Sequence, residues 1–577
     1  MNLIKKWFVS QRWSGRVIDS ILAIFIGIIG GLGAILFRLF IKFFQNLFYH
    51  NTNDFITFCH TVPLYLKILI PALGGLIAGP LICFVAKEAK GHGVPEIMEA
   101  LLLKSGRIRP RLTFMEMLIS AICIGSGGSV GREGPIVMIG AAAGSTMGQL
   151  LKAPQERLRT LVGCGAAAGI AATFNAPIGG VLFAVEVLLN DFRLEKFSPI
   201  ILASVTATTI SRHYYGNFPA LEVPSYQLLH ATEFVFYAIL GILCGLMALL
   251  FIEVLYRSED FFDNLPLPGY IKPLLGGTCM GVILIFFPHV FGVGYGAVNM
   301  ALKGELTWKL LLLLIFVKIM ATSITLGSGE SGGVFAPSLF IGAMTGGAFG
   351  YLVHIVFPQI TAGSGAYALV GMGALVGAAT HGPITAILII FELTGNYLII
   401  LPLMVSCIIS TFVITFLKDG SIYTLKLRRK GLSLKRGWEQ TILESFQVKD
   451  VMKTDFDTVS ETAAIDEIIE TLGKSHHSYL IVTNAHGELT GILSFHDVRE
   501  VFLKRKERGE IKAKDIATQK VVSVTTNDNL LTARHKLGSL GISQLPVVDE
   551  KNPKKVLGMI SLKDIISFHE KELLKRI

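Results

Sequence analysis

The chain of 577 residues is poor in charge, and the charge that it has is unevenly spread. Charged residues make up 16% of the sequence, against about 25% in ordinary soluble domains. Residues 419–577 hold 48 of the 94 charged residues, whereas the much longer stretch 1–418 holds only 46. This distribution excludes a wholly soluble protein and predicts a membrane part followed by a soluble part.

Cysteine chemistry is also missing. The seven cysteines are scattered between Cys59 and Cys407, no two are spaced as C-x-x-C, and the charged tail has none. The sequence therefore indicates neither a disulfide framework nor a zinc site. It also shows no nucleophile–base pair, no cluster of metal ligands and no phosphate-binding loop, so we expect no catalytic residues, no bound metal and no required cofactor, and we do not expect an enzyme.

The net charge of +10 does not indicate nucleic-acid binding. The basic clusters, such as residues 426–430 and 504–508, lie beside or outside the apolar stretches. Lys and Arg that flank membrane spans are retained on the cytoplasmic side. We therefore expect a multi-pass protein of a plasma or inner membrane, in contact with the lipid bilayer, with a cytoplasmic tail and with no nucleic-acid partner.

The apolar part is duplicated. Residues 125–148 align without a gap onto residues 327–350, with Gly, Ser and Pro at matching positions. Several apolar segments reach the roughly 20 residues that a helix needs to cross a bilayer, and others are shorter or broken by Gly and Pro. Broken helices in paired positions point to a transport site. We expect repeat halves of about residues 17–215 and 230–418.

A glycine-rich motif with a single acid opens a helix in each half. Gly131-Arg132-Glu133-Gly134-Pro135 is matched by Gly333-Val334-Phe335-Ala336-Pro337 in the second half. Pro suits the first turn of a helix, and a helix N-terminus attracts anions through its free N–H groups and its dipole. Two such ends that faced each other could hold chloride without a full positive charge. A glutamate at such an end would compete with the anion, or would merely cap its own helix.

These motifs, in this order and spacing, resemble the CLC family of chloride channels and chloride/proton exchangers. The resemblance covers residues 1–430 as a membrane domain. It implies a homodimer of helical subunits, each with two inverted halves and its own pore, and Glu133 as the gate. The implied anion-binding residues are His92, Gly93, Arg132, Glu133, Gly134, Val334, Phe335 and Tyr423.

The first anion motif departs from the family pattern. Members usually read G-S-G-I-P, whereas this chain reads Gly91-His92-Gly93-Val94-Pro95. A neutral imidazole can donate one N–H to an anion, and a protonated one would hold the anion more tightly. His92 is therefore either a ligand or an uninvolved side chain, and the preference among anions stays open.

A second departure concerns proton coupling. Exchangers of the family commonly carry a proton-transfer glutamate at the position of Val187, beside Glu186. Valine cannot relay a proton, so this proton-path position favours a passive channel of the voltage-gated type over a coupled chloride/proton antiporter. Rotation of Glu186 into the path remains an alternative, and Glu392 is its counterpart in the second half.

The tail repeats as well. After a linker of residues 431–446, residues 447–505 and 511–570 resemble two cystathionine-β-synthase (CBS) domains of the α/β class. Asp497 and Asp564 match the positions that hold a ribose in CBS pairs that bind adenine nucleotides, although the pair could serve dimerisation alone. Two more distant readings are a divalent-cation transporter with CBS domains and a membrane-anchored nucleotide sensor.

Overall fold

The computed structural model describes residues 12–50, 55–216, 221, 223–224, 226, 228–432, 443, 446–475, 479–503 and 511–575. The chain divides into two compact units, Met1–Lys426 and Leu427–Ile577. Most of the expected linker, 431–446, and the expected end of the first CBS domain at residues 504–505 lie outside the described residues.

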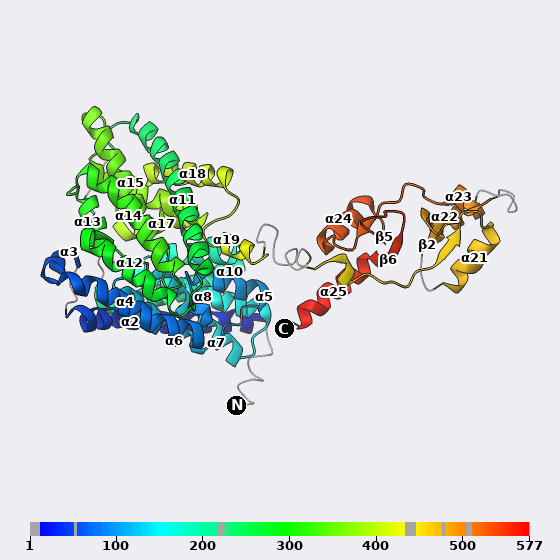
Figure 1. The fold of residues 1–577 in the computed structure, drawn as a ribbon, viewed down its shortest axis with the longest axis horizontal. Helices are drawn as coiled ribbons and strands as arrows, with labels where there is room; N and C mark the ends of the chain where they lie inside the picture. Colours follow the sequence, from blue (N-terminus) through cyan, green and yellow to red (C-terminus); the bar gives the residue numbers. More distant parts are fainter. Residues whose placement is uncertain are drawn as a thin grey trace. The chain divides into compact units, whose positions relative to one another are not determined.

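The described residues of the first unit form helices joined by loops and include no β-strand, and the helices fall into two series (Figure 1). The principal helices of the first series are α2 (Arg12–Tyr49), α4 (Leu64–Pro80), α5 (Val94–Leu103), α6 (Arg111–Ser126), α7 (Glu133–Leu150), α8 (Gln155–Phe174), α9 (Pro177–Leu182) with its π-helical continuation η4 (Phe183–Leu189), and α10 (Leu194–Tyr215).

The second series repeats that order. Its helices are α11 (Glu233–Asn264), α12 (Lys272–Phe286), α13 (Tyr295–Leu302), α14 (Trp308–Gly327), α15 (Phe335–Val356), α16 (Ser364–Thr380), α17 (Pro383–Thr394) and α18 (Ile400–Leu417), after which α19 (Thr424–Arg429) closes the unit. Short helices α5 and α13, and α9 and α17, occupy corresponding places, as the breaks at Gly and Pro predict.

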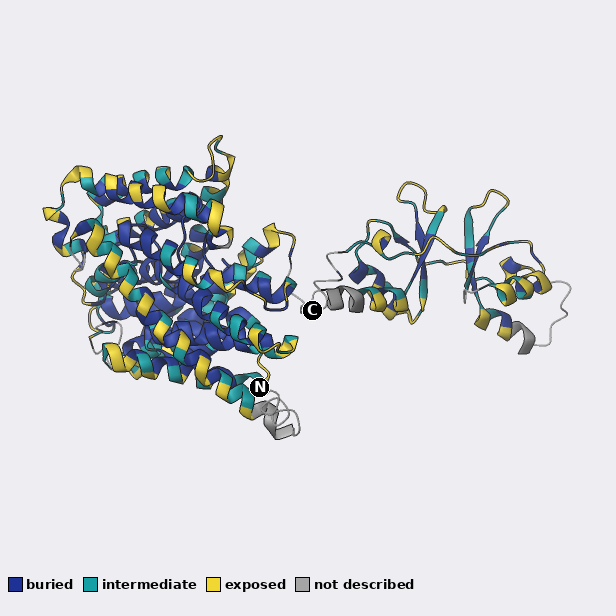
Figure 2. Ribbon diagram, turned by 90° about the horizontal axis from the view of Figure 1, so that it is seen from below, coloured by how far each residue is buried: buried dark blue, intermediate teal, exposed yellow. Residues whose placement is uncertain are grey.

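Six helices of the described residues are long and apolar enough to cross a membrane: α2, α4 with its extension to Val85, α11, α14, α15 and α18 with the turn before it. Their apolar side chains divide between the interior and the surface, and Figure 2 shows exposed residues recurring along the outer helices while the interior is buried. Exposed apolar side chains such as Phe412 and Phe416 suit contact with lipid. The chain is an integral multi-pass membrane protein.

In each series, small residues let the same pair of neighbouring helices pack closely. A Cβ atom on Gly140 of α7 would lie 2.0 Å from the carbonyl oxygen of Gly165 on α8, and one on Gly342 of α15 would lie 2.3 Å from that of Gly371 on α16. Backbones that approach this closely exclude any side chain at the contact. The glycine ladders of the two motifs therefore pack α7 on α8 and α15 on α16.

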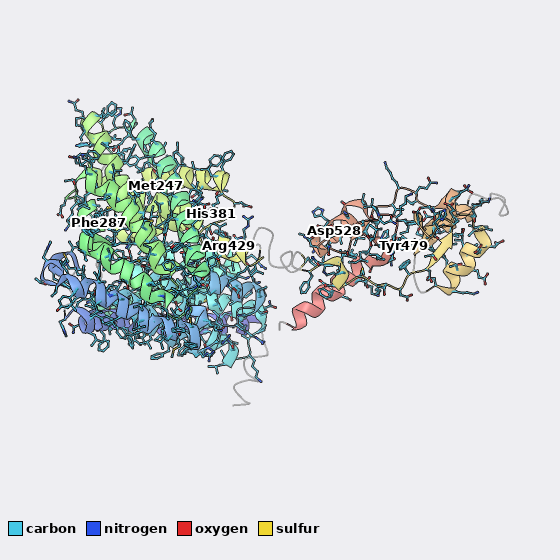
Figure 3. The ribbon with its side chains drawn as sticks, in the orientation of Figure 1. Met247, Phe287, His381, Arg429, Tyr479 and Asp528 are labelled. Atoms are coloured by element: carbon cyan, nitrogen blue, oxygen red, sulfur yellow. The ribbon has the colours of Figure 1, made fainter. Side chains whose placement is uncertain are left out.

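The second unit contains two α/β modules of the same topology. Strands β1 (Thr458–Ser460), β2 (Tyr479–Thr483) and β3 (Leu489–Ser494) form one sheet, and β4 (Val524–Thr525), β5 (Gln544–Val548) and β6 (Val556–Ser561) form the other. In each sheet the middle strand pairs parallel to the first and antiparallel to the third. Figure 3 labels Tyr479, where β2 begins.

Helices cover these sheets and the modules exchange segments. They are α21 (Ile465–Lys474), α22 (Phe495–Leu503) and α23 (Ala513–Ile516) with the first sheet, and α24 (Leu530–Leu540) and α25 (Leu562–Lys575) with the second. Val448, which precedes the first module, is buried in the core of the second, and its N–H donates to the Asp528 carbonyl at 2.8 Å. The predicted helical membrane part with a C-terminal pair of α/β modules is confirmed.

Candidate anion site

Three loops far apart in the sequence meet inside the first unit. Gly131 and Gly333 exchange two backbone hydrogen bonds, of 2.7 and 2.6 Å, in an antiparallel bridge. Gly91 donates to the Glu330 carbonyl at 3.3 Å and accepts from the Gly332 N–H at 3.1 Å. These bridges bring the start of α5, α7 and α15 together, because each loop leads directly into one of these helices.

Glu133, the first residue of α7, turns its side chain toward the other half of the unit. Its Oε2 accepts the backbone N–H of Ala336 at 3.3 Å, and the hydroxyl of Tyr295 donates to Oε1 at 3.4 Å. Only 1% of the residue is exposed. The carboxylate therefore lies at the N-terminus of α15, where the helix dipole and a free N–H attract negative charge.

Val334 and Phe335 form that N-terminus and are both buried. The Phe335 ring is held by Phe174 at the end of α8, with ring centroids 5.3 Å apart, and by Phe183 in η4, at 6.5 Å. Aromatic pairs at these separations fix the ring in place. The backbone N–H groups that follow are thereby held in a defined position beside Glu133.

His92 is fully buried, and neither of its ring nitrogens has a hydrogen-bond partner within the part of the chain that the structure describes. Its ring lies edge-on to Tyr256 with centroids 6.2 Å apart. Gly93 adopts φ +77° before α5, which glycine adopts without strain. A Cβ on Gly134 would lie 2.2 Å from the His92 carbonyl oxygen, so only glycine fits there. A buried, unpaired imidazole is costly, and an anion would satisfy its N–H.

Tyr423 and Arg132 lie in different surroundings. Tyr423 is 2% exposed and lies just before α19. Its neighbour Ile422 is anchored by an N–H donated to the Ala379 carbonyl at 2.8 Å. Arg132 precedes α7 and places its guanidinium over the ring of Tyr295, 5.3 Å from the centroid.

The Glu186 side chain caps the N-terminus of α17, a helix of the opposite half. Its oxygens accept the N–H groups of Ile384 at 3.2 Å and Thr385 at 2.7 Å, together with the Thr385 hydroxyl at 2.5 Å. Glu392 does the same for α9 and accepts the N–H groups of residues 178 and 179 at 3.0 and 2.7 Å. Each carboxylate therefore caps a helix of the other half, whereas the neighbouring Val187 packs as a buried apolar residue.

The sequence reasoning missed two residues beside Glu133. Besides Tyr295, the buried Lys318 of α14 interacts electrostatically with Glu133 and donates to the carbonyls of Val290 and Gly292 at 3.3 and 3.1 Å. The lysine in the middle of the apolar run 310–326 was a visible signal, because ionisable groups inside membrane segments usually serve function. Tyr295 gave no such signal.

Three further ionisable groups beside the site were also missed. Lys426 of α19 forms an ion pair with Glu96 of α5 at 2.8 Å, close behind the loop that carries His92. Glu116 of α6 is fully buried and accepts the Ser331 hydroxyl at 3.1 Å. These contacts join α5, α6 and α19 to the loops of the site. They are tertiary contacts, which a local sequence pattern does not predict.

In the second unit, the two aspartates cap the helices that follow the sheets. Asp497 accepts the N–H and hydroxyl of Ser494 at 2.7 and 2.6 Å. Asp564 accepts the N–H of Ser561 at 3.1 Å and pairs with Lys453 at 2.8 Å. Burial alone would raise the pKa of the Asp564 carboxyl, but hydrogen bonds from Lys453 and Ser561 outweigh it and hold the pKa below its usual value. Both carboxylates thus have a structural role.

Comparison with known proteins identifies the families to which the two units are similar. The family described as "Voltage gated chloride channel" matches residues 74–415, and the CBS domain matches residues 448–504 and 513–571. The chain belongs to this family of CLC proteins and carries a C-terminal CBS pair.

Individual relatives cover most of the membrane unit. A ClcB-like protein of Ralstonia nicotianae is 34% identical over 408 residues, which are 70% of this chain and 95% of the relative. The H(+)/Cl(-) exchange transporter ClcA of Yersinia pestis is 30% identical over 72% of this chain and 88% of its own length. The crystal structure of a slow cyanobacterial Cl-/H+ antiporter superposes with a TM-score of 0.65 at 29% identity, over 71% of this chain and 97% of that one.

Proposed function

We propose that this protein passes chloride passively across a membrane, between the N-termini of α7 and α15, and that Glu133 gates the path. The observation that carries the proposal is the hydrogen bond that the Ala336 N–H donates to the Glu133 carboxylate. The same donor can hold a chloride ion once the carboxylate leaves. A site made of N–H groups and helix dipoles binds an anion without a full positive charge, so the anion can also leave quickly.

The remaining predicted site residues extend this path. His92 would offer a ring N–H, and the start of α5 after Gly93 would offer further backbone donors. Val334, Phe335 and Gly134 shape the two helix N-termini, Arg132 supplies positive charge beside Glu133, and the Tyr423 hydroxyl faces the anion from the other end. Membership of the family supports chloride as the transported ion.

Passive conduction is supported by the residues at the proton-path position. The Val187 side chain has no group that can carry a proton. Both oxygens of its neighbour Glu186 accept hydrogen bonds from the start of α17, so rotation of Glu186 into a proton path would leave two N–H groups of that helix without their acceptor.

We further propose that two copies assemble into a homodimer, that the two helix series are inverted relative to each other, and that the CBS pair lies on the cytoplasmic side of a plasma or inner membrane. An adenine nucleotide would bind the CBS pair through Asp497 and Asp564. Because Asp564 is paired with Lys453, Asp497 is the freer of the two carboxylates.

The second candidate function is coupled chloride/proton exchange. It is favoured by the relatives named as exchangers, among them the ClcA transporter and the cyanobacterial antiporter. It would require a proton path that avoids Val187.

The experiment is transport in liposomes that contain the purified full-length protein, with internal chloride and pH both recorded. Passive conduction predicts that a chloride gradient dissipates without uphill proton movement. Proton uptake against its gradient, driven by chloride, would establish exchange instead. Flux should change in Glu133→Ala and stay unchanged in Glu305→Ala, which removes an exposed carboxylate between α13 and α14. No anion flux in the wild type would overturn the proposed function.

A further inference from the structure

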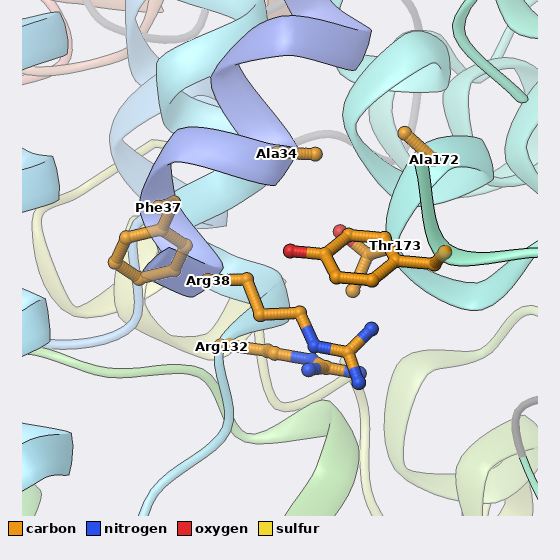
Figure 4. Close-up of a pocket in the computed structure, with 7 residues that line it drawn as sticks. Ala34, Phe37, Arg38, Arg132, Ala172 and Thr173 are labelled. Atoms are coloured by element: carbon orange, nitrogen blue, oxygen red, sulfur yellow. The ribbon is translucent and has the colours of Figure 1, made fainter. Parts of the chain in front are cut away.

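Two arginines from different helices line one small pocket close to Glu133. Arg38 comes from α2 and Arg132 from the turn before α7, and Figure 4 shows both guanidinium groups pointing into the pocket. The pocket is also lined by Tyr215, at the end of α10, and by apolar or small side chains, namely Ala34, Phe37, Ala172 and Thr173.

The described residues that line the pocket include no acidic side chain, and the one carboxylate that acts on Arg132 from outside that lining is the neighbouring Glu133. Arg38 interacts unfavourably with the charge of Arg132, and its guanidinium carbon lies 4.2 Å from the centroid of the Tyr215 ring. Arg38 also lies within an apolar membrane span, Val17–Tyr49. An arginine at such a position usually pairs or faces a cavity, because an unpaired charge there is costly.

Unused hydrogen-bond donors point into the same place. Arg132 Nε and the Tyr215 hydroxyl are both buried atoms that find no hydrogen-bond partner among the residues described. Two positive charges and two free donors on one pocket match a small anion, since buried donors need an acceptor and like charges need a counterion. Tyr295 connects the pocket to the gate, because its ring lies under Arg132 and its hydroxyl donates to Glu133.

We infer that Arg38, Arg132 and Tyr215 form an additional binding site for a small monovalent anion, from which the ion enters the path when Glu133 moves. This inference rests on the proposed anion transport. It adds to the path a residue, Arg38, from a helix that carries none of the motifs. Occupation of the site would raise the local anion concentration beside the gate and would relieve the repulsion between the two arginines.

The first test measures the chloride concentration that gives half-maximal flux in liposomes. Arg38→Gln should raise this concentration by about three- to tenfold, while Arg38→Lys, which keeps the charge, should retain most of the affinity. The matched control is Lys42→Gln, which removes one positive charge from an exposed position one turn further along α2. Tyr215→Phe should give a smaller increase than Arg38→Gln.

The second test locates the anion directly. Crystals of the full-length protein in bromide should show an anomalous peak between Arg38 and Arg132, and Arg38→Gln crystals should lose it. An unchanged half-maximal concentration in Arg38→Gln, or no peak in the wild type, would show that Arg38 only stacks on Tyr215 and would overturn the site. Wild-type protein without chloride flux would instead overturn the proposed function, so the two failures are distinguishable.

Discussion

The two reciprocal caps allow a sharp prediction about Glu186. In Glu186→Ala, the N–H groups of Ile384 and Thr385 lose their acceptor, as does the Thr385 hydroxyl. Thr385 is buried, and its unsatisfied donors cost about 1–3 kcal/mol, whereas the exposed Ile384 N–H adds little. Loss of a carboxylate from a helix N-terminus costs about 0.3–1 kcal/mol more. Local opening of the first turn of α17 should therefore become easier by about 3 kcal/mol, which is roughly a 150-fold change in the opening equilibrium.

The assay is amide hydrogen exchange of the full-length protein. Amides 384 and 385 should exchange roughly 100-fold faster in Glu186→Ala, while amides 178 and 179, which Glu392 caps, stay near their wild-type rates. Glu392→Ala should give the reverse pattern and is the matched control. Glu186→Gln, which keeps one acceptor oxygen, should fall between the wild type and Glu186→Ala.

A loss of proton movement without any change in amide exchange would refute the capping role of Glu186. If the wild type moved protons uphill, and Glu186→Gln abolished that movement while amide exchange at α17 stayed unchanged, Glu186 would be a proton carrier and the cap would be incidental. The inference of passive conduction from Val187 would then be wrong as well.

Three other changes have defined outcomes. Gly134→Ala places a Cβ 2.2 Å from the His92 carbonyl oxygen, so the loops must separate by about 1 Å, and liposome flux should fall roughly 10–100-fold while circular dichroism stays helical. Lys318→Met removes a positive charge that acts on Glu133 and should weaken chloride affinity about fivefold, or ~1 kcal/mol, in a flux titration. Asp564→Ala removes the acceptor of the Ser561 N–H just before α25, a capping contact worth about 1 kcal/mol, so the Ser561 amide should exchange about fivefold faster at pH 7. Because the pKa of this carboxyl is lowered by folding, its stabilisation is present above the unfolded value of about 3.9, and the difference between variant and wild type should vanish as pH falls through the folded value.

The sequence predicted those parts of the fold that depend on local pattern. The motifs at Gly131–Pro135 and Gly333–Pro337 specify a glycine turn that enters a helix, and duplication implies equivalent places in two halves. The structure joins the two motifs through the bridge between Gly131 and Gly333. The two modules of the tail could also be predicted from the sequence. Both repeat the same strand pattern, and both end on a Ser followed three residues later by an Asp, Ser494 with Asp497 and Ser561 with Asp564.

The contacts that surround the site could not be predicted from the sequence, because they join residues from different helices that lie far apart along the chain. Lys426 reaches Glu96, Arg38 reaches Arg132, and the Tyr295 hydroxyl reaches Glu133 only after the helices pack. Each of these side chains is unremarkable in its own segment.

The sequence predicted that Glu186 and Glu392 are equivalent residues of the two halves. It did not predict that Glu186 caps a helix. The spacing of Pro and Glu in the two halves marks the residues as counterparts. It does not say that each carboxylate binds the helix of the other half, since this depends on how α9 and α17 approach each other.

The most direct test of the account is the crystal structure of the full-length Glu133→Gln protein in bromide. If the carboxylate occupies an anion site, the neutral side chain should release it, and an anomalous bromide peak should appear beside the N–H of Ala336, where Oε2 lies in the wild type. Wild-type crystals grown in the same way should lack that peak. If the Glu133→Gln protein shows no bromide between the N-termini of α7 and α15, those termini are not an anion site, and Glu133 is only a helix cap.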